Sequence, residues 1–143
     1  MTPLEKIQQL YRDYILQAEE LEKNKRPTDG MFGLTRKPAD DVCHEQFIQH
    51  LNALMAEFRL EGIASDQLRD VLEMVFFAAQ THREPASIYW MLIAAHSATP
   101  DMIPLLNRED AKALYDQYCR VYKRGTRLPV QKKLVKELEK AMK

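Results

Sequence analysis

The stretch at residues 40–45 reads DDVCHE and gathers the side chains most often used for metal binding and acid–base chemistry. Asp41 and Glu45 are four residues apart, so on a helix their carboxylates share one face, and His44 stands beside them. These three residues are the candidate metal ligands, and their oxygen-rich chemistry suits a hard cation. Zinc is disfavoured, because the chain has no C-x-x-C pair and no two histidines four residues apart.

The same stretch supplies the candidates for a catalytic site, which are Cys43, His44 and Glu45. A cysteine close to a helix N-terminus can have a lowered thiol pKa and act as a nucleophile. His44 cannot serve as its base within one helix, because adjacent residues point about 100° apart. A general base would have to come from a distant segment, with His82 and His96 as the available histidines.

A purely structural interpretation of residues 40–45 competes with both chemical ones. Aspartate is a preferred N-cap residue, so Asp40 and Asp41 fit the start of a helix that runs from about Asp41 to Arg59. Cys43 lies four residues before Phe47 and therefore falls on the buried side of that helix. We expect a helix start, and a chemical site only if the long preceding segment 24–40 brings other groups to it.

The C-terminal segment 120–143 carries the strongest electrostatic signal in the chain. It holds 9 basic and 2 acidic residues, whereas residues 1–119 hold 12 basic and 19 acidic ones. Such a segment can bind the phosphates of nucleic acid or an acidic surface, or it can simply neutralise the acidic remainder. The candidate residues for polyanion binding are Lys123, Arg124, Arg127, Lys132, Lys136 and Lys140.

Apolar periodicity predicts a compact all-α single domain over residues 1–143, with six or seven helices around a buried central helical hairpin and no β-sheet. We expect helices over about 3–23, 41–59, 65–81, 85–97, 108–122 and 129–143, with a loop over 24–40 and a helical turn at 99–104. The hairpin is expected over roughly 66–97, where two helices become apolar on every side. His96 ends this apolar stretch, which predicts a hydrogen-bonded core residue rather than a ligand. The buried stripe of the 108–122 helix is expected to be Leu114, Tyr115, Tyr118, Cys119 and Tyr122.

Composition sets the remaining expectations for function. Two cysteines are too few for a disulfide framework, and the N-terminus lacks the apolar core of a secretion signal, so we expect a cytoplasmic protein with no membrane span and no cofactor. The leading hypothesis is a non-catalytic protein–protein interaction or adaptor domain, self-associating or binding a partner protein through its first or last helix. The alternatives are polyanion binding through residues 120–143, and a small enzyme or metal site at the 24–45 loop–helix junction.

Overall fold

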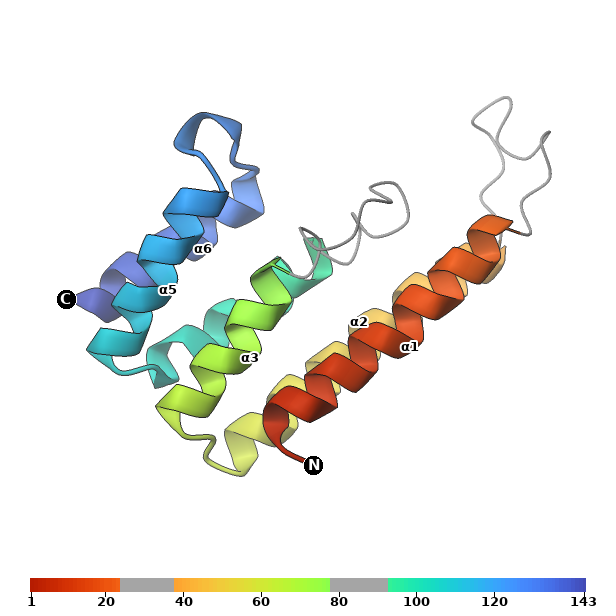
Figure 1. Cartoon of the computed structure of the whole chain (residues 1–143), viewed down its shortest axis with the longest axis horizontal. Helices are drawn as coiled ribbons and strands as arrows, with labels where there is room; N and C mark the ends of the chain where they lie inside the picture. Colours follow the sequence, from red (N-terminus) through yellow and green to blue (C-terminus); the bar gives the residue numbers. More distant parts are fainter. Residues whose placement is uncertain (24–37, 78–92) are drawn as a thin grey trace.

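The computed structural model describes residues 1–23, 38–77 and 93–143, and every regular element in these ranges is helical (Figure 1). The elements are α1 (Pro3–Lys23), α2 (Pro38–Leu60), α3 (Ser65–Phe77), η2 (Pro100–Leu105), α5 (Arg108–Val121), η3 (Arg124–Thr126) and α6 (Pro129–Met142). Residues 93–98 are also helical. No strand occurs in the described ranges, which confirms the predicted all-α class. None of the described helices is long and apolar enough to cross a membrane.

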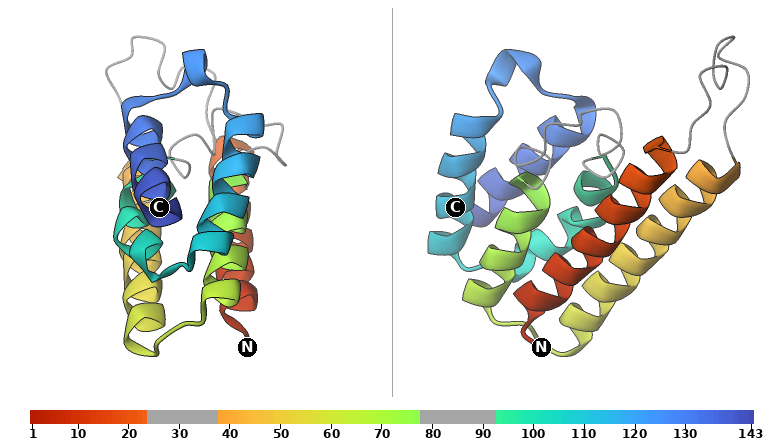
Figure 2. Two further views of the ribbon diagram at one scale, coloured as in Figure 1. Left: turned by 90° about the vertical axis from the view of Figure 1, so that its left-hand side faces the viewer. Right: turned by 45° about the vertical axis from the view of Figure 1, so that its right-hand side comes forward.

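The helices stack in two layers (Figure 2). One layer contains α1, α3 and α5, and the other contains α2, residues 93–105 and α6. Contacts join α1 to α2, α5 to α6, and α3 to both of its neighbours in the first layer. α3 therefore has the central position expected for the first half of the hairpin, while residues 78–92 of that hairpin lie outside the described residues.

Local sequence signals account for several helix ends. The N–H of Glu5 donates to Thr2 Oγ1 at 3.1 Å, and the N–H of Thr2 donates to the Glu5 carboxylate at 3.3 Å, which is a reciprocal capping box. The side chain of Asn107 accepts from the N–H of Asp110 at 2.8 Å and caps α5. These starts were predicted from the sequence, and the structure confirms them.

The start of α2 differs from the prediction. α2 begins at Pro38, so Asp40 and Asp41 lie inside its first turns and are not the cap. Proline fits the first helical position because its φ is fixed and its missing N–H has no partner there. Pro3 and Pro129 begin α1 and α6 in the same way. The prediction was wrong because it treated Pro38 only as a loop residue; the rest of the expected loop, 24–37, lies outside the described residues.

An aromatic cluster fills the core between α3 and α5. Phe76 and Tyr118 are fully buried, and their rings meet edge to face with centroids 5.8 Å apart. His96 is 1% exposed, and its Nε2 lies 2.8 Å from the Tyr118 hydroxyl. The hydrogen bond satisfies two buried polar groups at once, and it confirms His96 as a core residue.

Candidate anion-binding groove

A groove of about 800 Å³ lies between α5, α6 and the segment that joins them. Its basic lining residues are Arg124, Arg127, Lys132 and Lys136, and its other lining residues are Tyr115, Cys119, Val135 and Glu139. Helix α5 supplies one wall, η3 and the residues after it supply one end, and α6 supplies the other wall. Residues that are up to 24 positions apart in the sequence are thus brought to one concave surface.

The turn between the two helices is held by hydrogen bonds. The N–H of Tyr122 donates to Tyr118 O and closes α5, and the N–H of Thr126 donates to Lys123 O at 3.0 Å within the η3 turn. Pro129 then begins α6, where the side chain of Gln131 accepts from the N–H of Leu128 at 2.8 Å. The buried Gln131 fixes the first turn of α6, and this sets the direction in which the lysine side chains of α6 project from the helix.

Arg127 is the most firmly placed cation of the groove. Its Nε donates to the carbonyl oxygen of Tyr122 at 3.0 Å, and its Nη2 lies 3.3 Å from Cys119 Sγ. The side chain is half-buried, whereas those of Lys132 and Lys136 are exposed. A half-buried guanidinium with further N–H donors is a strong group for binding a carboxylate or a phosphate.

The structure divides the six residues predicted for polyanion binding into two sets. Arg124, Arg127, Lys132 and Lys136 line the groove, and Lys123 and Lys140 are not among its lining residues. Lys140 instead lies beside a carboxylate of its own helix, with Nζ 3.3 Å from Glu137 Oε1.

The groove itself has a positive charge balance. Among the described lining residues, four cations are opposed by one carboxylate, that of Glu139, so positive charge dominates. Positive charges around one concavity raise the local concentration of an anionic ligand there.

Tyr115 and Cys119 were predicted to lie on the buried stripe of α5, but both are only partly buried, and Tyr115 packs at the edge of the core. Both are half-exposed and line the groove, while Leu114, Tyr118 and Tyr122 of the same predicted stripe are buried. A hydrogen bond with Cys119 raises the pKa of the Tyr115 phenol, with the nearby Cys119 charge acting in the same direction. The phenol, already protonated at neutral pH with its ordinary pKa of 10.0, is a neutral polar group at the groove wall.

The structure spreads the 40–45 residues over different environments. Cys43 is 4% exposed and belongs to the core, beside Tyr14, whose pKa is raised by its own burial and by the nearby thiol. His44 is half-buried and Glu45 is exposed. The side chain of Asp41 lies outside the described residues, as does His82.

The metal and catalytic hypotheses for this segment stay predictions. In the part of the chain that the structure describes, no three His, Cys, Asp or Glu side chains are grouped closely enough to hold a metal ion. The candidate set Asp41, His44 and Glu45 includes a side chain outside that part, so the set as a whole is not placed.

Known proteins supply no further information about the groove. No protein-family model, no curated protein and no solved structure matches this chain. A function for the groove therefore has to be inferred from its geometry and its charge.

Proposed function

We propose that this chain binds a phosphate-bearing polyanion in the α5–α6 groove, and that the polyanion is single-stranded nucleic acid. The observation that carries the proposal is the convergence of Arg124, Arg127, Lys132 and Lys136 on one concave surface. Phosphate oxygens are bound by arginine and lysine side chains, and the release of counterions from the nucleic acid adds to the affinity.

The shape of the groove favours a flexible strand over a flat surface. A membrane can reach side chains that project from the protein, but Arg127 is half-buried beside the wall of α5. A single strand can follow a concave surface, and the half-exposed ring of Tyr115 gives one base a face for stacking. Sequence-specific recognition is not part of the proposal, because charge and one aromatic ring read no base edges.

The test uses the full chain and a fluorescently labelled oligouridylate of about twelve nucleotides, which is within the length that small single-strand-binding surfaces cover. Fluorescence anisotropy at low salt reports the affinity. The variant Lys132→Glu/Lys136→Glu reverses two groove cations. Lys123→Glu/Lys140→Glu makes the same change in net charge at two predicted residues that do not line the groove.

We expect the groove variant to bind the oligonucleotide at least about tenfold more weakly, and the control variant to lose much less affinity. An equal loss in both variants would show that general attraction to a basic segment is at work, and the groove assignment would be rejected. Vesicles rich in phosphatidylserine form the second arm. If they bind the chain and the oligonucleotide does not, the nucleic-acid proposal is overturned in favour of an acidic surface.

The leading sequence-based hypothesis, a protein–protein interaction domain, stays a prediction. Among the described residues, much of the apolar face of each terminal helix is used within the chain itself. Ile7 and Tyr11 of α1 and Leu134 and Leu138 of α6 are all buried in the core. A partner protein would therefore need another surface.

A further inference from the structure

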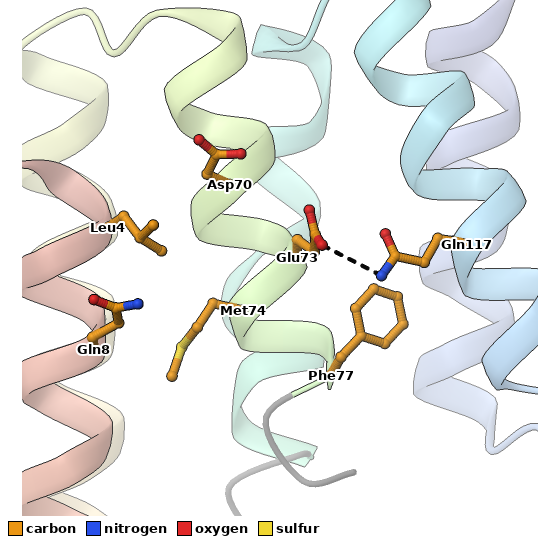
Figure 3. A pocket seen from close by; sticks show the side chains of 7 residues that line it. All are labelled: Leu4, Gln8, Asp70, Glu73, Met74, Phe77 and Gln117. Atoms are coloured by element: carbon orange, nitrogen blue, oxygen red, sulfur yellow. Dashed lines mark hydrogen bonds between the residues drawn. The ribbon is translucent and has the colours of Figure 1, made fainter. Parts of the chain in front are cut away.

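A second groove lies on the layer formed by α1, α3 and α5, and Figure 3 shows it from close by. Its volume is about 370 Å³. Its lining residues include Leu4 from α1, Asp70, Glu73, Met74 and Phe77 from α3, and Gln117 from α5. Leu4 and Gln117 point toward α3 from its two sides, so α3 forms the floor and its neighbours form the walls.

The floor combines two carboxylates with apolar groups. Asp70 is exposed and Glu73 is half-exposed, and neither forms an ion pair with a cation of the described residues. Glu73 only accepts a long hydrogen bond, 3.4 Å, from Gln117 Nε2. Leu4, Met74 and Phe77 are half-exposed, and they supply the apolar part of the lining.

We propose that this groove docks a basic amphipathic helix of a partner protein. Asp70 and Glu73 are three residues apart on α3, so they can pair with two Lys or Arg side chains that are one helical turn apart. Met74 and Phe77 repeat the same spacing nearer the end of α3, where apolar side chains of the partner helix would pack. The flexible side chain of Met74 can adapt to different apolar partners.

This surface is distinct from the polyanion groove in place and in sign of charge. Among the described residues, the two grooves share no lining residue, and this one carries Asp70 and Glu73 with no lining cation. The inference therefore does not depend on the proposed function, and one can fail while the other holds.

A second copy of this chain does not suit the groove. Its basic amphipathic helix is α6, and the apolar residues Leu134 and Leu138 of that helix are fully buried in their own chain. The copy would offer lysines whose main apolar neighbours on α6 are already buried. The lining of the groove is complementary to a helix that presents basic and apolar side chains on one face, and a separate partner protein can supply such a helix.

The test uses a helix-forming peptide of about eighteen residues, with leucines along one stripe and lysines beside it. Two matched peptides replace either all lysines by glutamate or all leucines by alanine. Fluorescence anisotropy of each labelled peptide is measured with the full chain. We expect the leucine–lysine peptide to bind, and both matched peptides to bind at least about tenfold more weakly.

Charge reversal in the chain locates the site. Asp70→Lys/Glu73→Lys should abolish most of the binding. Glu20→Lys/Glu45→Lys, an equal charge change at exposed carboxylates of α1 and α2, should leave it nearly unchanged. Circular dichroism checks the fold, and Asp70→Asn/Glu73→Gln replaces the reversal if that variant unfolds.

Three outcomes would overturn the proposal. Equal weakening by both charge reversals would mean that the acidic body of the chain attracts any basic peptide. If the alanine peptide bound as tightly as the leucine–lysine peptide, apolar contacts would contribute nothing to binding, and the proposed docking of an amphipathic helix would be rejected. The third concerns self-association and is read by sedimentation. If the wild-type chain formed a dimer and the Asp70→Lys/Glu73→Lys variant were a monomer, the occupant of the groove would be a second copy and not a separate partner.

Discussion

The guanidinium of Arg127 is fixed against the thiol of Cys119, with 3.3 Å between Nη2 and Sγ, while its Nε donates to Tyr122 O. Two contacts on one side of the planar group leave its other N–H donors for a ligand. Arg127 thus contacts the C-terminal end of α5 and also lines the groove between α5 and α6. The same side chain supports the turn and supplies a placed positive charge.

Replacement of Arg127 separates its two roles. Arg127→Lys keeps the positive charge but loses the fork that reaches two acceptors, so we expect oligonucleotide affinity to fall about threefold to tenfold. Arg127→Ala should add a loss of about 1–2 kcal/mol in the free energy of unfolding, because the carbonyl of Tyr122 loses a charged donor. Anisotropy and urea denaturation measure the two effects. A lysine variant with wild-type affinity would contradict a requirement for the fixed guanidinium.

Salt dependence gives an independent count of phosphate contacts. With four cations in the groove, the slope of log affinity against log salt is expected to reach about −3 for a single strand, from about −0.7 per phosphate. The Lys132→Glu/Lys136→Glu variant should flatten the slope by about one to one and a half. Anisotropy titrations at several salt concentrations provide the slopes. A slope near zero in the wild-type chain would argue against phosphate binding.

The fold depends on a polar clamp that joins the start of α3 to the start of α5. Asp110 is 8% exposed and accepts hydrogen bonds from Ser65 Oγ at 2.5 Å and from Arg69 Nη1 at 3.2 Å. Ser65 Oγ in turn accepts from the N–H of Asn107 at 2.8 Å. A single carboxylate therefore fixes how the central helix meets α5.

Removal of that carboxylate should destabilise the chain. We expect Asp110→Ala to lower the free energy of unfolding by about 1–3 kcal/mol, because the half-buried Ser65 hydroxyl and the Arg69 guanidinium both lose their acceptor. Asp66→Ala changes an exposed aspartate in the first turn of α3 and should cost well below 1 kcal/mol. Urea denaturation of both variants gives the comparison. Equal losses would show that the effect comes from the helix dipoles, with no special role for the clamp.

Helix starts could be predicted because their signals are local. The capping box of Thr2 and Glu5 and the cap at Asn107 each act within three residues, and the structure has both. The role of Asp110 could not be predicted in the same way. Its partners Ser65 and Arg69 are more than 40 residues away, so no local pattern could indicate them.

The groove was only partly predictable for a related reason. The charge of residues 120–143 is visible in the sequence, and four of the candidates that it indicated for polyanion binding, Arg124, Arg127, Lys132 and Lys136, line the groove. Lys123 and Lys140 could not be separated from them by charge alone. Helical periodicity placed Tyr115 and Cys119 with the buried stripe of α5, because it cannot show where two packed helices diverge and leave a concavity.

Gly62 ends α2 in a conformation that other residues rarely adopt. Its φ is +67°, and its N–H donates to Arg59 O while that of Ile63 donates to Phe58 O, which is the Schellman pattern. Gly62→Ala should cost about 1 kcal/mol of unfolding free energy, although nothing lies within 4 Å of the added Cβ. Gly125→Ala, at an equally open site without a positive φ, should be neutral or slightly stabilising. Similar losses in both variants would exclude backbone strain as the cause.

The stability of the chain should fall at alkaline pH because of its buried tyrosines. Burial raises the pKa of the Tyr118 hydroxyl well above its ordinary value of 10.0, and burial does the same for Tyr11. A phenol whose pKa is higher in the folded chain contributes stability that is fully present below the unfolded-state pKa and is lost as pH rises above it. We therefore expect the contribution of these two phenols to the free energy of unfolding to be constant up to about pH 9 and to fall above about pH 10.

The variant Tyr118→Phe tests this assignment. It removes one phenol that must ionise on unfolding at high pH, so the fall in stability above about pH 10 should be shallower than in the wild-type chain. At neutral pH the variant should be about 1 kcal/mol less stable, because His96 loses its hydrogen bond to the Tyr118 hydroxyl. Urea denaturation across the pH range gives the stabilities, and phenolate absorbance gives the titration. A Tyr118 phenol that ionises near the ordinary pKa of 10.0 would contradict its burial.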